Sequence, residues 1–413
     1  MSGRTDHPEL PAALATALAA VLATGAAAVQ SAPAHDAIPV PRVRAPRMPS
    51  VPAAQAAPIE AIGPDGASTV VSADAAPPAL DGIRAALLVG RGLAPLGMPG
   101  QMVLVLADGQ RLVGSPATSE TGTVWVSPWV APVPLALNGV RAVILSGARA
   151  PAVADEDVVE LRNGDRATGV VTALTMSAVS VERASGDERT TVDVPLDEVA
   201  AIGLVGPAAP RTGMRAWLAD GSVLDAPRFE WSGEDYLVAA GVRGARTGAL
   251  TVPRRMLVGV QSSPDGARAL ASMPAEAVKR AGSEGAREWI PAPRAQPGTW
   301  VLDAPPLEVE GPVVLRYPAL GSPATLRMTV RRPPTALEAG SPDLVVRSGG
   351  REVLRERLSP DRPEVALSAA LSAGPFEVEL ASADGSLAGN FAVLERALVV
   401  PASSGLQPSP SQR

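Results

Sequence analysis

The residues of this chain best suited to binding chemistry are a few aromatic side chains in its second half. Trp231 and Tyr236 bracket an acidic turn, while Trp300 and Tyr317 belong to a later apolar segment. An exposed aromatic ring can stack on the apolar face of a pyranose ring. The same residue types also pack small cores, because they contribute a large burial energy. Both interpretations, core residue and ligand contact, stay open for these four aromatics.

A run of arginines in the last quarter of the chain is the second candidate. Arg355 and Arg357 follow Arg351 and Val353 at every second position, so all four would share one face of a strand. Such a stripe could bind the carboxylates of an anionic glycan or of a partner protein. Arginines on an exposed strand also prevent it from pairing with another chain. We favour this second role and keep Arg355 and Arg357 as candidate ligand-binding residues.

The sequence lacks the residue types on which many catalytic and metal sites are built. It has no cysteine, and its two histidines, His7 and His35, precede the first expected core. A histidine-based triad, a thiolate nucleophile and a histidine-rich metal site are therefore excluded. The acidic groups at 155–157 and 197–198 lie at turns and strand entries, where solvation explains them. We expect no catalytic residue, no metal, no cofactor and no enzyme activity.

Charge and motif argue against nucleic acid and phosphate ligands. The net charge is −6, whereas surfaces that bind nucleic acid need a net basic field. The glycine-containing stretch 90–97 lacks the spacing of a dinucleotide loop. Prolines also stand where the phosphate-binding helix would begin.

The elements that must position the candidate residues are expected to be β-strands, because one short pattern recurs three times. Each copy has an apolar run, an Asp-Gly or Asn-Gly turn, a second run, and later a closing run led by proline. The turn glycines, Gly109, Gly164 and Gly221, are 55 and 57 residues apart. This period indicates one supersecondary unit per copy, and the turn residues predict a hairpin with a type I′ turn.

These repeats predict an all-β chain of tandem small β-barrels or bent sheets. A shortened copy precedes the three clear ones, so repeat units are expected at 59–100, 101–150, 151–210 and 211–263. Four or five short strands in each unit suit a strongly bent sheet or an SH3-like barrel. Residues 264–298 form a connector, in which 267–281 has some helical spacing interrupted by a proline.

A separate β-sandwich, of jelly-roll type, is expected over residues 299–402, followed by a polar tail at 403–413. Seven alternating runs, with glycine-containing turns between several of them, fit about 100 residues of sandwich. The runs cover 313–317, 324–330, 343–348, 351–358, 364–369, 375–382 and 391–400.

The N-terminal segment predicts export. Residues 11–29 carry no charge and small residues follow, which indicates a secretory signal within 1–30. An uncleaved membrane anchor or a simple alanine-rich helix fits the same residues. The span 31–58 holds seven prolines and reads as an extended tether. We expect a periplasmic, cell-envelope or extracellular protein, with membrane contact only through an uncleaved N-terminal segment.

The order of these parts resembles exported planctomycete-type proteins, in which turn-punctuated β units precede an NPCBM module. The stretches at 343–358 and 375–400 resemble the hairpin and the final strands of that module. The resemblance implies a galactose-binding-like sandwich of the carbohydrate-binding type. The chain lacks the family's glycine-histidine stretch. It has Gly389-Asn390-Phe391-Ala392 where the family tends to carry acidic residues and a tryptophan, so the module is expected to be a degenerate one.

The sequence thus predicts an exported, non-catalytic protein that binds carbohydrate or cell-envelope glycan through its C-terminal sandwich. The alternative is an envelope scaffold for protein–protein interactions whose sugar-binding module is degenerate.

Overall fold

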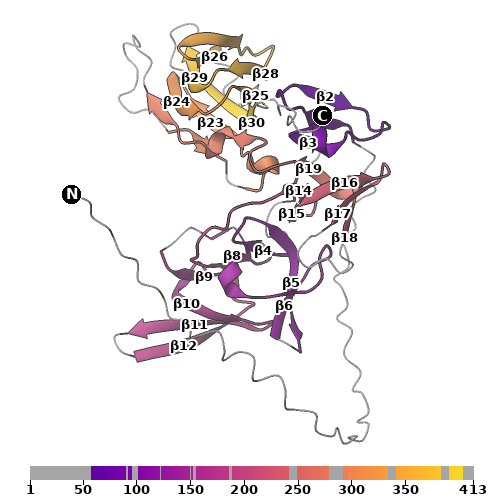
Figure 1. Ribbon diagram of the computed structural model, residues 1–413. Coiled ribbons are helices and arrows are strands. Elements are labelled where there is room, and N and C mark those ends of the chain that lie inside the picture. The colour runs from indigo at the N-terminus through magenta and orange to yellow at the C-terminus, as the bar shows by residue number, and fades with distance from the viewer. Residues whose placement is uncertain are drawn as a thin grey trace, which may run out of the picture. The chain divides into compact units, whose positions relative to one another are not determined.

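The computed structural model describes residues 57–89, 92–94, 101–120, 122–148, 150–151, 155–185, 188–240, 249–278, 292–296, 298–333, 341–382 and 390–402. These residues form β-strands and short 3-10 turns without an α-helix, so the all-β prediction is confirmed (Figure 1). They all lie in one compact unit, residues 45–413. The predicted signal segment and the C-terminal tail lie outside the described residues, as does nearly all of the tether. No helix in the described part is long and apolar enough to cross a membrane.

The repeat region begins with the shortened copy and continues with three fuller ones. The shortened copy has β1 Ile59–Ile62, β2 Ser68–Val71, η1 Leu80–Gly82 and β3 Ala85–Leu88. The first full copy has β4 Met102–Leu106, β5 Arg111–Ser119, β6 Gly122–Val126, β7 Val133–Pro134, η2 Leu137–Gly139 and β8 Val140–Ile144. The second has β9 Asp157–Leu161, β10 Arg166–Leu174, β11 Ala178–Ser185, β12 Glu188–Pro195 and β13 Val199–Gly203. The third has β14 Met214–Leu218, β15 Val223–Ala226, β16 Arg228–Ser232, β17 Tyr236–Ala240, β18 Ala249–Pro253, η3 Arg254–Met256 and β19 Leu257–Gln261.

The hairpin turn has the same geometry in all three copies, but it is not the expected type I′. Gly109, Gly164 and Gly221 have φ of 85°, 91° and 92°. The aspartate or asparagine before each of these glycines does not have a positive φ. In the first copy the Leu106 amide donates to the Gln110 carbonyl and the Gly109 amide to the Leu106 carbonyl. This is a type I turn followed by a left-handed glycine bulge, which needs only one positive φ.

The closing strand of each copy returns to its first strand and then pairs with another copy. β8 pairs with β4, β13 with β9, and β19 with β14. Antiparallel pairs β8–β13 and β3–β19 then join the copies, and a single residue pair links β5 to β15. The resulting hydrogen-bonded ladder continues across the predicted unit boundaries. Those boundaries, and the SH3-like barrel, stay predictions.

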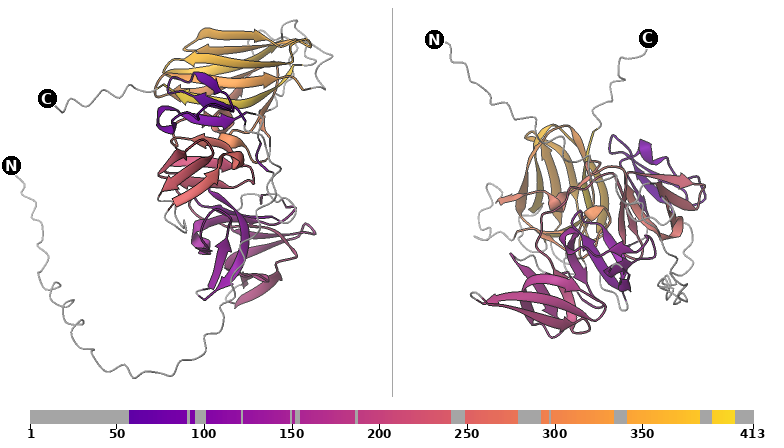
Figure 2. Two further views of the ribbon diagram at one scale, coloured as in Figure 1. Left: turned by 90° about the vertical axis from the view of Figure 1, so that its right-hand side faces the viewer. Right: turned by 60° about the horizontal axis from the view of Figure 1, so that its bottom comes forward.

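Two sheets make the C-terminal sandwich (Figure 2). One has the order β22-β23-β30-β25-β28 with β20 beside β30, and the other β21-β24-β29-β26-β27. The elements are β20 Arg268–Ala269, η4 Leu270–Ser272, β21 Glu276–Val278, β22 Arg294–Ala295, η5 Val301–Asp303, β23 Leu307–Glu310, β24 Val313–Leu320, β25 Ala324–Arg331, β26 Pro342–Ser348, β27 Arg351–Arg357, β28 Glu364–Leu371, β29 Gly374–Ser382 and β30 Phe391–Pro401.

All seven strands expected from alternation are present, and their inward side chains form one apolar core. In β25 every second residue is buried, as a strand with one face on a core requires. The spacing at 267–281 favoured a helix, but the described residues of this range contain no α-helix. Residues 268–278 form β20, η4 and β21, because pairing with β30 and β24 outweighs a weak local preference.

Candidate functional site

The segment that enters the sandwich holds Trp300 in a fixed orientation. The indole Nε1 of Trp300 donates to the Gln296 carbonyl oxygen at 3.1 Å. Gly298, with φ of 138°, packs beside the ring, and a Cβ on it would lie 3.4 Å from Nε1. Because the polar end of the indole is already bonded, the ring contributes mainly its apolar surface to the surroundings.

The turn after Trp300 has an unusual backbone. Leu302 and Asp303 in η5 have φ of 59° and 49°, a left-handed conformation that costs about 1–3 kcal/mol per non-glycine residue. Two anchors hold it. The Leu302 side chain is buried in an apolar cluster that includes Trp217. The Asp303 carboxylate lies 3.3 Å from the Arg215 guanidinium.

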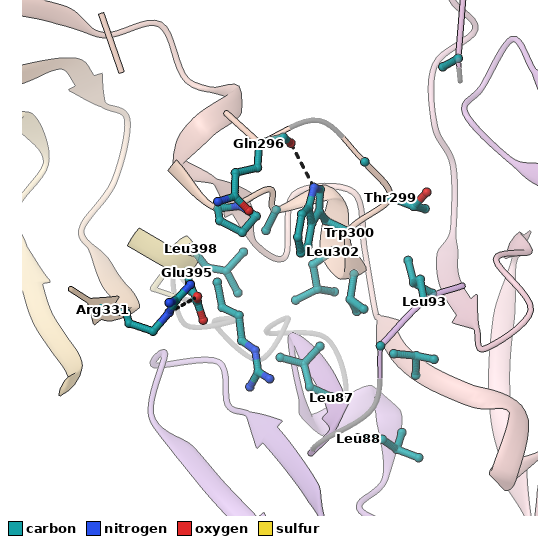
Figure 3. Close-up of a pocket in the computed structure, with 18 of the residues that line it drawn as sticks. Leu87, Leu88, Leu93, Gln296, Thr299, Trp300, Leu302, Arg331, Glu395 and Leu398 are labelled. Atoms are coloured by element: carbon teal, nitrogen blue, oxygen red, sulfur yellow. Dashed lines mark hydrogen bonds and ion pairs between the residues drawn. The ribbon is translucent and has the colours of Figure 1, made fainter. Parts of the chain in front are cut away.

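Beside this turn lies a cavity of about 920 Å³, within the range typical of small-molecule sites. Part of its wall is apolar, with Leu87, Leu88, Leu93, Val258, Leu302 and Leu398. Its polar lining includes Gln296, Thr299, Arg331, Glu395 and Arg396. In Figure 3, Trp300 and Leu302 lie between the Arg331–Glu395 pair and Leu93. The cavity therefore combines an aromatic wall with hydrogen-bonding groups on other sides.

The polar groups of the cavity differ in how far they are already bonded. Arg331 Nε donates to Glu395 Oε1 at 2.8 Å, and each of these side chains is partly exposed. Gln296 Nε2 donates to Glu308 Oε1 at 2.9 Å. The buried hydroxyl oxygen of Thr299 has no hydrogen-bond partner among the described residues. Because this oxygen is shielded from solvent, a ligand reaches it only if the Thr299 side chain turns.

Of the four aromatic candidates, only Trp300 lies at this cavity. Tyr317 is in the sandwich core, 2% exposed and stacked on Phe376 with ring centroids 4.8 Å apart. Its ligand interpretation was therefore wrong. Burial raises the pKa of its hydroxyl far above the usual value. The alternation of β24 brings it inward with Val313 and Leu315.

The other two aromatic candidates lie near each other in a different sheet. Trp231 and Tyr236 belong to the three-stranded sheet β16-β17-β18. Trp231 packs against the repeat core, and its Nε1 donates to the Pro78 carbonyl oxygen at 3.0 Å. Tyr236 is 45% exposed. Neither lines the cavity, so their ligand role stays a prediction.

The arginine candidates are on β27, at the edge of the second sandwich sheet. Arg351, Val353, Arg355 and Arg357 are all exposed, as expected from their spacing. Arg355 and Arg357 lie 3.1 Å and 2.9 Å from the carboxylate of Asp343 on β26. Burial acts to raise the pKa of Asp343, but the two arginines outweigh it and the pKa is lowered. These guanidiniums are thus paired within the sheet.

Five polar residues of the cavity were missed by the sequence analysis. Gln296 and Thr299 lie in a stretch without clear periodicity. Arg331, Glu395 and Arg396 look like ordinary surface charges on strands. Among the residues that the structure describes, no group of three or more histidine, cysteine, aspartate or glutamate side chains could hold a metal ion.

No family model and no curated protein sequence matches the chain. Among solved structures it is similar to CBM51 from Clostridium perfringens GH95 in complex with methyl-galactose, with a TM-score of 0.22 and 9% identity over 23% of this chain and 70% of that one. It is also similar to the CBM51-2 and INT domains of Clostridium perfringens ZmpB, with a TM-score of 0.27 and 11% identity over 42% and 39% of the two chains. The tandem CBM51 modules of Sp3GH98, a family 98 glycoside hydrolase of Streptococcus pneumoniae, give a TM-score of 0.27 and 9% identity over 83% and 88%. These neighbours are carbohydrate-binding modules, but at such TM-scores we draw no conclusion about this chain from them.

Proposed function

We propose that this chain is an exported, non-catalytic protein that binds carbohydrate in the cavity beside Trp300. The observation that carries the proposal is the combination of an oriented indole with polar groups around one cavity of about 920 Å³. A pyranose has apolar faces and a rim of hydroxyls, so it needs both kinds of contact. The proposal of export rests on the uncharged segment 11–29 and the small residues after it.

The polar lining suits hydroxyl recognition. The Gln296 side chain donates from Nε2 to Glu308, and its carbonyl oxygen can accept a hydrogen bond from a sugar hydroxyl. The Glu395 carboxylate, fixed by Arg331, keeps lone pairs that can accept hydrogen bonds from others. Because Arg331 neutralises the charge of Glu395, this acceptor adds no net charge to the cavity lining. A sugar ring with several hydroxyls therefore fits the cavity's chemistry.

The test is binding of the full chain to a panel of soluble neutral and carboxylated oligosaccharides, measured by isothermal titration calorimetry. We expect Trp300→Ala to weaken binding of any panel ligand at least about tenfold, because loss of aromatic burial costs about 1.5–3 kcal/mol. Trp300→Phe keeps a flat ring and should lose less. Circular dichroism and thermal unfolding confirm that each variant is folded.

Tyr236→Ala is the matched control, because Tyr236 is an exposed aromatic outside the cavity. It should bind with unchanged affinity. The proposal is wrong if no oligosaccharide in the panel binds. It is also wrong if binding survives in both Trp300 variants, or if only Tyr236→Ala abolishes it.

A further inference from the structure

The strand β30 changes the phase of its alternation at the cavity. Ala392 and Leu394 point into the sandwich core before this point, and Ala397 and Val399 do so after it. The register with β25 shows the cause. Thr329 pairs with Glu395 and Arg327 with Leu398, so two residues of β30 face one of β25. This is a β-bulge.

The bulge places two charged side chains on the same face of the sheet. In a regular strand Glu395 and Arg396 would point to opposite faces. Here both line the cavity, together with Leu398 from the next position on that face. Bulges of this kind commonly re-aim a side chain at a functional site.

Arg396 forms the bulge in a conformation that normally belongs to glycine. Its φ is 48°, and a left-handed residue at this position of a bulge is usually glycine because it lacks a Cβ. The described non-glycine residues with positive φ are Leu302, Asp303 and Arg396, and two of these three line the same cavity. An arginine in a conformation that glycine adopts more easily points to a use for its side chain.

Among the residues that the structure describes, the guanidinium of Arg396 is only weakly paired. It is 54% exposed, and its Nη1 lies 4.0 Å from Glu60 Oε2. The other oxygen of Glu60 accepts a hydrogen bond from Arg327 Nη2 at 2.8 Å. Since Arg331 and Glu395 neutralise each other, Arg396 leaves the cavity lining with an excess of one positive charge.

We infer that the ligand of this cavity is an acidic sugar whose carboxylate pairs with Arg396. The inference rests on the proposed function and adds the ligand class to it. An arginine guanidinium binds a carboxylate through two parallel hydrogen bonds, which neither Thr299 nor Gln296 can offer. The ring of the same sugar contacts Trp300 and the neutral polar groups. A uronic acid or another carboxylated pyranose has this combination of a ring, hydroxyls and one anionic group.

The experiment compares Arg396→Gly with the unaltered full chain. Glycine accepts the left-handed conformation, so the variant should unfold at an equal or higher temperature while losing the guanidinium. We expect its affinity for galacturonate oligosaccharides to fall at least about tenfold, the usual effect of losing a charge-assisted hydrogen bond. Binding of the methyl-esterified oligosaccharides, which lack the carboxylate charge, should change less than threefold.

Two further variants guard against other causes. Arg396→Asn also tolerates a left-handed backbone and should reproduce the loss. Arg351→Gln removes the same charge from the exposed edge strand β27 and should leave affinity unchanged, which excludes a general effect of net charge. The inference is overturned if methyl esters bind as tightly as acids, or if Arg396→Gly binds acids normally. In either case binding that still depends on Trp300 would leave the proposed function standing.

Discussion

Replacing Arg215 by methionine tests how the turn beside the cavity is held. The Arg215 side chain is 4% exposed and donates to both carboxylate oxygens of Asp225, at 2.6 Å and 2.8 Å. It also donates to the Asp108 carbonyl at 2.7 Å and to Asp303 at 3.3 Å. Its loss leaves the 8% exposed Asp225 without its hydrogen-bonded ion-pair partner, so that of the two arginines acting on it only the charge of Arg211 remains. Breaking such a pair costs about 3–5 kcal/mol of unfolding free energy.

The loss should depend on pH in a definite direction. Burial raises the pKa of Asp225, and the hydrogen bond and charge of Arg215 oppose that rise. Without Arg215 the pKa of the folded variant rises further above the unfolded value of about 3.9. The folded state then binds more protons than the unfolded state between those two pKa values, so the variant's unfolding free energy falls as pH rises through this window. Its deficit should be smallest near pH 4, where mainly the contacts to Asp108 and Asp303 are lost, and should grow as pH rises through this window.

Urea unfolding followed by tryptophan fluorescence measures this, at several pH values. The double variant Arg215→Met/Asp225→Leu removes both charges and should be far less destabilised than Arg215→Met alone. Arg215→Lys keeps a charge but not the planar fork, and should be intermediate. A deficit in Arg215→Met that stays constant from pH 4 to pH 8 would refute the reasoning. The reasoning would also be refuted if the double variant lost as much unfolding free energy as Arg215→Met and Asp225→Leu lose separately, added together.

Three further changes probe the fold. Asp343→Asn should make the unfolding free energy depend less on pH in the acid range. The lowered pKa of the Asp343 carboxyl stabilises the folded state above the unfolded pKa of about 3.9, and this contribution is lost as pH falls below that value. We expect at most about 1 kcal/mol at pH 7, since its arginine partners are largely exposed. Gly114→Ala should destabilise by about 1–3 kcal/mol or more in urea unfolding, because its Cβ would lie 2.1 Å from the Val126 carbonyl oxygen; Gly82→Ala, with open space around it, should change little. Trp125→Phe should cost about 2–4 kcal/mol in the same assay, because it removes the 3.1 Å hydrogen bond from Nε1 to the Leu112 carbonyl and leaves a cavity where the fully buried indole was.

The strands could be predicted because their signal is local. Alternation along 324–330 reports a core face without reference to the partner strand, and the structure buries every second residue there. The pairing of β8 with β13 could not be predicted in this way, since it joins residues about 60 positions apart whose own runs look like any other closing run. The turn type was missed for a similar reason. Asp-Gly suits both a type I′ turn and a type I turn with a bulge, and only the register of the flanking strands separates the two.

The cavity shows where period-two reasoning fails. Applied to the run 391–400, it places Glu395 and Arg396 on opposite faces, one inside the sandwich and one outside. A charge in the sandwich core would be costly, and the bulge removes that conflict by inserting one residue opposite β25. The strand thereby keeps aliphatic residues in the core on both sides of the bulge, and both charges face the cavity. Two adjacent charged residues inside an otherwise alternating apolar strand are therefore evidence for a bulge. A search for binding sites from sequence should include such pairs.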